Sequence, residues 1–218
     1  MIEILVKAAL GYLLGSIVGS LLIGRLRGGV DIRHLGSGNA GATNALRTQS
    51  KAFAFGVLLI DLGKGWLATG LLAVSQIPGI ASGPAHVQAW SVAVCGVTVM
   101  LGHIYPLWHG FRGGKGVATL VGAVLGALPA LLLPMLMVWL VVVVLTGYVG
   151  LASILGAIAF AVGTATSGVE PRAPLLTFAV LSALLIAFTH RTNISRMLAR
   201  TEPRARRLWL LGAARSRF

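Results

Sequence analysis

The chain has 218 residues, of which 56% are hydrophobic and only 11% are charged, and its formal net charge is +13. So few charges cannot cover the surface of a soluble domain of this size, which favours a protein embedded in lipid. Most basic residues gather in three stretches, 25–51, 112–115 and 191–217. Basic clusters beside apolar segments are typical of cytoplasmic loops of membrane proteins, so nucleic acid is not an expected partner.

Apolar segments of membrane-spanning length alternate with polar loops from the start of the chain. Residues 4–24 predict a first transmembrane helix, since basic residues follow this run and do not precede it as in a signal peptide. Residues 52–75 and 89–105 predict the second and third helices. The basic loop 25–51 is expected in the cytoplasm and the uncharged loop 76–88 outside.

The stretch 117–166 is apolar throughout and must hold more than one helix. The basic loop before it and the arginine-rich tail after the last span, 174–189, should both be cytoplasmic, so it must hold an odd number of spans. Three short helices fit, with an outer turn suggested by Pro129 and Pro134 and an inner turn at 146–153. The sequence therefore predicts one all-α, polytopic membrane domain over residues 1–218, with seven transmembrane helices, the N-terminus outside, the C-terminus inside and no β-sheet.

The first basic loop combines glycines with short polar side chains. Gly36, Gly38 and Gly41 allow a turn whose successive N–H groups point at one anion. Arg47 adds a cation that can form two parallel hydrogen bonds. The further donors of this predicted phosphate site are Ser37, Asn39, Thr43 and Asn44. The same glycines match a dinucleotide-binding fingerprint, but a membrane helix precedes them where that fingerprint requires a strand, which excludes it.

The second basic loop surrounds one lysine with glycines. His109 stands where a nucleotide-binding P-loop needs a glycine before Lys115, so this is not a nucleotide site. A lysine snorkelling at a helix end would explain Lys115 alone. It would not explain the neighbouring glycines, which predict close approach of backbone and ammonium to an anion: Gly113, Gly114 and Gly116.

Polar residues also occur at the end of the last span and inside the second. His190 and Asn193 share a helix face at i,i+3. Asp61 and Lys64 have the same spacing and are interpreted as a structural pair bordering the site. The three polar segments expected on the cytoplasmic face are 31–51, 102–119 and 190–202. Their cations suit a site for more than one phosphate, and include Arg33, Arg47, Lys51, Arg112, Lys115, Arg191 and Arg196.

Several catalytic patterns are missing from the sequence. No Asp or Glu stands five residues after any histidine, so the His-x4-Asp acyltransferase box is absent. There is also no Gly-x-Ser-x-Gly elbow, no zinc-binding set and no acidic pair for magnesium. We therefore expect chemistry without metal or cofactor, which orients activated phosphate substrates and stabilises their charge.

The polar strings occur in a fixed order along nearly the whole chain. They are Gly36-Ser-Gly-Asn-x-Gly-Ala-Thr-Asn-x-x-Arg47, Asp61-x-x-Lys64-Gly65, Gly102-His103-x-x-Pro106, Phe111-x-Gly-Gly-Lys-Gly-Val-Ala-Thr119 and His190-Arg-x-Asn-Ile-x-Arg196. This order resembles the signature of the bacterial acyl-phosphate:glycerol-3-phosphate acyltransferases, the PlsY family. The resemblance implies transfer of a fatty acyl group from acyl phosphate to the 1-hydroxyl of sn-glycerol 3-phosphate, with lysophosphatidic acid and inorganic phosphate as products. It implies a site on the cytoplasmic side of the bacterial inner membrane, no cofactor and no obligate protein partner.

The resemblance also implies roles for individual residues. The acyl-phosphate head is expected at Ser37, Gly38, Asn39 and Thr43, in the loop that also holds Gly36 and Gly41. Glycerol 3-phosphate is expected at Arg47, Lys115, His190 and Asn193. Lys51, Gly114 and Ser153 are further expected substrate-binding positions, not assigned to either substrate. The residues expected to carry catalysis are Ser37, Arg47, Lys115, His190 and Asn193. Direct attack by the glycerol hydroxyl, with the leaving phosphate accepting the proton, is favoured over His190 acting as general base.

Some positions depart from the family pattern. The family usually has glycine where Arg200 and Ser50 stand, and often proline at Val18. Residues 203–218 form a basic tail expected to lie on anionic lipid. The alternative function from another class is a transporter or channel for a phosphate-bearing solute, which often shows inverted repeats. The two halves of this sequence show no evident repeat, which favours the enzyme.

Overall fold

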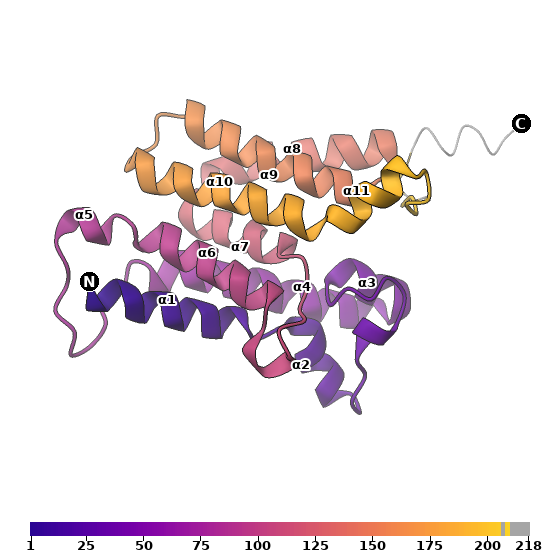
Figure 1. The fold of residues 1–218 in the computed structure, drawn as a ribbon, viewed down its shortest axis with the longest axis horizontal. Coiled ribbons are helices and arrows are strands. Elements are labelled where there is room, and N and C mark those ends of the chain that lie inside the picture. Colours follow the sequence, from indigo (N-terminus) through magenta and orange to yellow (C-terminus); the bar gives the residue numbers. More distant parts are fainter. Residues whose placement is uncertain (206–207, 210–218) are drawn as a thin grey trace, which may run out of the picture.

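The computed structural model describes residues 1–205 and 208–209, and these residues form helices and loops without a strand. Figure 1 shows the helices packed side by side along one axis. The elements are α1 (Ile2–Gly15), α2 (Gly19–Leu26), η1 (Ile32–His34), α3 (Ala42–Thr48), α4 (Lys51–Trp66), η2 (Leu67–Leu72), α5 (Ala85–Gln88), α6 (Ser91–Ile104), η3 (Leu107–His109), α7 (Val117–Ala127), α8 (Pro129–Thr146), α9 (Val149–Thr166), α10 (Arg172–Thr189) and α11 (Arg191–Leu198).

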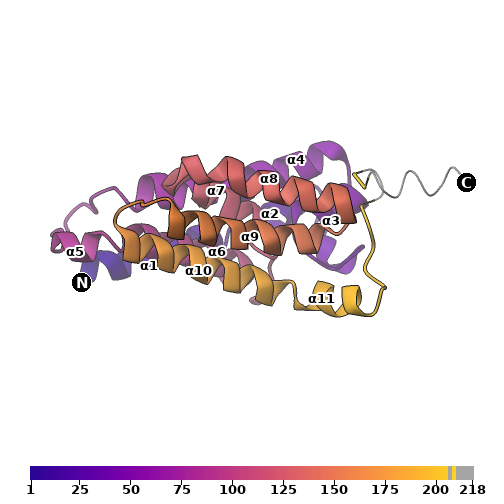
Figure 2. The same ribbon diagram turned by 90° about the horizontal axis from the view of Figure 1, so that it is seen from above.

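Successive long helices reverse direction, so the connecting segments gather at two ends of the bundle. Both views place α2, α3 and α11 at one end, and the N-terminus and α5 at the other (Figures 1 and 2). We refer to the end that carries α2, α3, α11 and the loop 105–116 as the motif end. The three polar segments, predicted to share a face, lie at this end.

Most of the long helices are apolar enough to cross a membrane. Among the described residues, five helical segments pass by length and composition, and α1 with α2 makes a sixth if the bent pair is one span. The prediction of three helices within 117–166 is confirmed by α7, α8 and α9. However, α7 has 11 residues and is about 16 Å long, roughly half the thickness of the hydrocarbon core.

The first predicted span is not one helix. Residues 4–24 were expected to form a continuous helix, but α1 ends at Gly15, α2 begins at Gly19, and their axes differ by 48°. Apolar composition predicts that a segment is helical, whereas a bend requires other groups to satisfy the backbone at the break. Here those groups come from α4.

The turns in the second half differ partly from expectation. Leu128 separates α7 from α8, and Pro129 occupies the first helical position, where its missing N–H costs nothing. Pro134 lies inside α8, so its assignment to the outer turn was wrong. The inner turn is only Gly147 and Tyr148, where Gly147 has φ of 76°. Ser153, expected in that turn, therefore lies within α9.

The bundle is held by apolar contacts and by close approach of helix backbones. Phe160 and Phe178 lie edge to face in the largest buried cluster, with ring centroids 5.6 Å apart. A Cβ on Gly65 of α4 would collide with the carbonyl oxygen of Thr119 on α7. Small residues of this kind let membrane helices pack closely, and here they bring α7 against α4.

Candidate active site

Asn44 organises the first loop. Its side chain is 1% exposed, and its Oδ1 accepts a hydrogen bond from the Ser37 N–H at 2.9 Å. Its Nδ2 donates to the carbonyl oxygens of Ile32 at 3.0 Å and Leu35 at 2.9 Å. Asn44 was predicted as a donor to phosphate. Its amide instead forms hydrogen bonds within the loop and stabilises the turn that carries Ser37.

Two of the three predicted glycines are required by the turn. Gly36 has φ of 58° and Gly38 has φ of 72°, in the left-handed region that favours glycine. Gly41 has φ of −102°, which any residue can adopt, and it precedes the first residue of α3. Around this turn Ser37 and Thr43 are exposed. Their hydroxyl groups are accessible to a substrate at the motif end.

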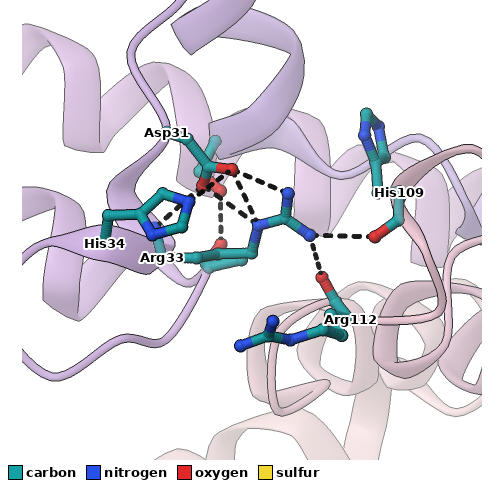
Figure 3. Close-up of polar contacts among 7 residues, drawn as sticks. Asp31, Arg33, His34, His109 and Arg112 are labelled. Atoms are coloured by element: carbon teal, nitrogen blue, oxygen red, sulfur yellow. Dashed lines mark hydrogen bonds and ion pairs between the residues drawn. The ribbon is translucent and has the colours of Figure 1, made fainter.

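Arg33 joins the first loop to the second (Figure 3). Its Nη1 donates to the carbonyl oxygens of His109 at 2.9 Å and Arg112 at 2.8 Å. The rest of its guanidinium faces Asp31, with Nη2–Oδ2 at 2.7 Å and Nε–Oδ1 at 3.0 Å. These hydrogen bonds lower the pKa of Asp31 and raise that of Arg33. Arg33, counted among the cations of the predicted face, is thus used to hold the two loops together.

The glycines before Lys115 serve close packing. The N–H of Gly113 donates to the Ile104 carbonyl at 3.0 Å, and that of Gly114 donates to the His103 carbonyl at 3.1 Å. A Cβ on Gly114 would collide with Nε2 of the His103 ring. Both amides are therefore used inside the protein, and the expected contact of Gly114 with substrate stays a prediction.

Lys115 and Asn193 bring the second and third polar segments together. The Lys115 ammonium donates to Asn193 Oδ1, and Asn193 Nδ2 donates to Glu202 Oε1 at 2.6 Å. The other carboxylate oxygen of Glu202 lies 2.6 Å from Arg196 Nε. Thr189 Oγ1 also donates to the Lys115 carbonyl at 3.0 Å. The result is a polar cluster that joins α11 to the loop before α7.

The His190 ring lies beside this cluster and is 4% exposed. Its Nδ1 is 2.8 Å from the Ile186 carbonyl oxygen. A carbonyl can only accept, so we assign the proton to Nδ1, which leaves Nε2 as an acceptor on the neutral ring. Burial, and then the nearby Lys115 charge, lower the pKa of His190 to about 4. The ring is therefore neutral at physiological pH.

Lys115 keeps its charge at neutral pH. Burial, and then the charge of Arg196, lower its pKa to about 8, while Glu202 opposes this change. At pH 7 most Lys115 side chains are protonated, because the pKa lies above that pH. The cluster thus offers an ammonium, an amide and a neutral imidazole side by side.

The remaining predicted residues surround this cluster less directly. Ser153 lies one turn along α9 from Gly150, which packs against Asn193, and its hydroxyl contacts Val149 and Trp139. Arg47 and Lys51 are exposed at the motif end, on α3 and at the start of α4. Within residues 1–205 and 208–209, no hydrogen bond or ion pair joins Arg47 or Lys51 to the polar cluster.

Glu202 and His103 are site residues that the sequence interpretation did not assign. Glu202 is one of only five acidic residues in a chain of net charge +13, and this scarcity was an available signal. His103 lies beneath Gly114, and nothing in its own segment marks that contact.

The described part of the basic tail folds onto the turn between α8 and α9. The N–H of Ala205 donates to the Gly147 carbonyl at 2.8 Å. The Arg204 guanidinium lies 4.7 Å from the Tyr148 ring centroid and 4.0 Å from that of Trp209. The rest of the predicted membrane-surface tail, 206–207 and 210–218, lies outside the described residues.

Comparison with known proteins places this geometry in a family. The model of the glycerol-3-phosphate acyltransferase family matches residues 5–200. The chain belongs to that family. A glycerol-3-phosphate acyltransferase of Agrobacterium fabrum is 39% identical over 197 residues, which cover 90% of this chain and 89% of the relative. One from Synechococcus sp. strain CC9902 is 40% identical over 200 residues, covering 92% and 94%.

Solved structures agree with this family assignment. The glycerol 3-phosphate form of PlsY (YgiH), described as an integral membrane glycerol 3-phosphate acyltransferase, aligns with a TM-score of 0.81 and 37% identity. Its lysophosphatidic acid form aligns with a TM-score of 0.77. Both alignments cover 92% of this chain and 94% of the other. This glycerol-3-phosphate acyltransferase family member is therefore an enzyme and a multi-pass integral membrane protein.

Proposed function

We propose that the protein transfers a fatty acyl group from acyl phosphate to the 1-hydroxyl of sn-glycerol 3-phosphate. The products are lysophosphatidic acid and inorganic phosphate. The observation that carries this proposal is the contact of Lys115 with Asn193 beside His190, in a chain similar to a PlsY solved with glycerol 3-phosphate. A cation, an amide and a neutral imidazole suit a small phosphate ester that also bears hydroxyl groups.

Lys115 and Asn193 would hold the phosphate end of glycerol 3-phosphate. The protonated Lys115 side chain supplies charge, and Asn193 orients it through the contact already present. Arg47, exposed at the motif end, is proposed to bind the same substrate. Ser37, Gly38, Asn39 and Thr43 are proposed to bind the acyl-phosphate head, with Gly36, Gly41, Lys51, Gly114 and Ser153 as further contacts.

In the proposed reaction, the two substrates supply both the bond that breaks and the acceptor for the hydroxyl proton. The 1-hydroxyl oxygen attacks the acyl carbonyl carbon, and the bond between that carbon and the phosphate oxygen breaks. The hydroxyl proton passes to the leaving phosphate, so hydrogen phosphate leaves and the ester remains. The cations of the motif end stabilise the negative charge that the transition state spreads over the carbonyl and phosphate oxygens.

His190 would orient the attacking hydroxyl without taking its proton fully. Nε2 of the neutral ring can accept a hydrogen bond from that hydroxyl. A ring whose pKa is about 4 is a weak base. The leaving phosphate gains negative charge as its bond to the acyl carbon breaks, so its oxygens are a stronger base than this ring. This difference favours substrate-assisted proton transfer over general-base catalysis by His190.

The proposed topology follows from the same arrangement. Seven passes result if α1 with α2 counts as one and the short α7 crosses within the bundle. Basic residues of the three polar segments lie at the motif end, which the positive-inside rule assigns to the cytoplasm of a bacterial inner membrane. The N-terminus would then lie outside and the C-terminus inside, with the basic tail 203–218 against anionic lipid.

The deciding experiment supplies purified protein with an acyl phosphate and glycerol 3-phosphate and follows both products. Lysophosphatidic acid and inorganic phosphate should appear in equal amounts. Acyl-CoA in place of acyl phosphate serves as the donor control. No product, together with flux of a phosphate-bearing solute into liposomes, would instead support the transporter.

A further inference from the structure

Three titratable side chains lie buried behind the proposed substrate site. Asp61 and Lys64 come from α4 and His103 from α6, and their exposed fractions are 1%, 3% and 3%. Lys64 Nζ lies 3.1 Å from Asp61 Oδ1 and 2.8 Å from His103 Nδ1. We refer to Asp61, Lys64 and His103 as the buried ion cluster. Charges among membrane helices are costly, so such a cluster calls for a function beyond packing.

The cluster occupies the break between α1 and α2. In a continuous α-helix the Gly19 N–H would donate to the Gly15 carbonyl. Here the Gly15 carbonyl accepts from Lys64 Nζ at 2.9 Å, and the Gly19 N–H donates to Asp61 Oδ1 at 3.1 Å. Lys64 Nζ also donates to the Ile17 carbonyl at 2.8 Å. The ion pair thus replaces one helical hydrogen bond and satisfies three backbone groups at the break, those of Gly15, Ile17 and Gly19.

The charges also match the helix ends that they face. Lys64 places its ammonium against the carbonyl end of α1, where the helix dipole is negative. Asp61 places its carboxylate at the N-terminus of α2, where the dipole is positive. Irregular backbone at membrane depth is tolerated only where its polar groups are satisfied internally. At the 48° bend between α1 and α2, this pair supplies such internal partners.

The same cluster reaches the second loop through His103. The His103 carbonyl accepts the Gly114 N–H at 3.1 Å, and Gly114 packs against the His103 ring. Lys64 contacts Nδ1 of that ring and so fixes its orientation. Lys115 follows Gly114 directly in the chain. The backbone next to Lys115 therefore packs against the His103 ring, which the ion pair holds in place.

We propose that Asp61, Lys64 and His103 are positioning residues, which keep the first span broken and set Lys115 in register with the first loop. None of the three needs to touch substrate. The part of this proposal that concerns acyl transfer rests on the proposed function above. Small displacements of substrate-holding groups lower rates steeply, so loss of the cluster should reduce turnover even in a folded protein.

The test removes both charges at once. Asp61→Ala combined with Lys64→Met leaves no unpaired charge in the bundle, and the Gly15 carbonyl and Gly19 N–H can rejoin as in a straight helix. The measurements are kcat and KM for glycerol 3-phosphate, and hydrogen exchange of peptides covering 27–41 and 105–116. We expect kcat/KM to fall by about 10- to 100-fold, with faster exchange in both loops.

A second buried ion pair provides a matched control. Glu3 and Lys7 lie 3.1 Å apart on α1 with side chains 7% and 3% exposed, near the N-terminus at the opposite end of the bundle. Glu3→Ala with Lys7→Met should leave kcat, KM and exchange at the motif end within about twofold of wild type, since it touches neither loop. A folded Asp61→Ala/Lys64→Met protein that behaves like this control would overturn the proposal.

Variants of His103 keep the proposal testable if the double variant does not fold. His103→Leu retains three acceptors for the Lys64 ammonium, namely Asp61 and the carbonyls of Gly15 and Ile17. It should lower kcat/KM and speed exchange across 105–116. His103→Asn restores an acceptor near the Nδ1 position and should recover part of the kcat/KM and part of the protection from exchange. Wild-type behaviour of His103→Leu would contradict the proposed positioning role of His103. Because exchange is measured without substrate, it decides the proposal even if the wild-type protein transfers no acyl group.

Discussion

The Lys115 ammonium donates a hydrogen bond to Asn193 Oδ1, across 78 positions of sequence. This contact joins the glycine-rich loop before α7 to the short helix α11 that follows the last long helix. Asn193 is fixed on its other side by Glu202 at 2.6 Å, so the amide cannot turn away from the lysine. These hydrogen bonds hold the amide and the ammonium in one arrangement, as electrostatic preorganisation requires.

The alkaline limb of the pH profile should follow Lys115. Its pKa is about 8 in the free protein, so kcat/KM should decline as pH rises through 8 and the ammonium loses its proton. The His190 pKa of about 4 predicts no loss from that ring between pH 5 and 7. Lys115→Arg should abolish the alkaline limb, because guanidinium stays charged. A limb that persists in this variant would show that another group titrates there.

His190→Gln should weaken binding more than it slows chemistry. Glutamine can accept a hydrogen bond from the glycerol hydroxyl but cannot take up its proton at neutral pH. Because the glutamine amide cannot place its oxygen where the ring holds Nε2, that hydrogen bond should weaken. KM for glycerol 3-phosphate should rise by up to about tenfold, with kcat within about tenfold of wild type. Thr192→Val, at an exposed neighbouring position, is the control. A kcat reduced by about a thousandfold at unchanged KM would instead identify His190 as the general base.

Arg33→Lys should loosen the junction of the first two loops. A lysine cannot reproduce the fork that contacts Asp31 and two carbonyl oxygens at once. We expect faster hydrogen exchange across 105–112 and a several-fold rise in KM for glycerol 3-phosphate. Arg112→Lys should have no such effect, because Arg33 uses the Arg112 carbonyl and not its side chain. Equal behaviour of the two variants would contradict this account.

Gly65→Ala should destabilise the bundle by about 1–3 kcal/mol, because the added methyl collides with the Thr119 carbonyl of α7. Gly63 offers a matched control two residues away on α4, where a Cβ would meet no atom within 4 Å. Gly63→Ala should be neutral or slightly stabilising. Thermal unfolding in detergent measures both. A Gly65→Ala protein as stable as Gly63→Ala would show that α4 and α7 are not packed this closely.

Arg200→Gly should stabilise the protein. Arg200 has φ of 57°, a left-handed conformation that costs a side-chain-bearing residue about 1 kcal/mol. The expected rise in Tm is about 2–4 °C. Ala199→Gly is the control, since Ala199 has φ of −77° and gains nothing from glycine. A lower Tm for Arg200→Gly would mean that its guanidinium makes a contact worth more than the backbone strain.

Several features of the site could be predicted from local sequence. Gly36 and Gly38 do adopt the left-handed conformation expected of a glycine turn. Asp61 and Lys64 do form the pair that their spacing predicts. The uses of Asn44 and Arg33 were not predictable in the same way, because a polar side chain can bind substrate or backbone with equal ease. Which of these it does depends on the carbonyl groups that folding brings near it.

The sequence by itself determined that this is a helical membrane protein whose polar segments meet at one end. Apolar runs specify helices, and helices that reverse direction return alternate loops to the same end. Only the tertiary structure decided that the first span breaks, since its Gly15 and Gly19 backbone groups are taken by Lys64 and Asp61 of another helix. Periodicity and charge depend on neighbours along the chain, whereas hydrogen-bond partners depend on which groups become buried together.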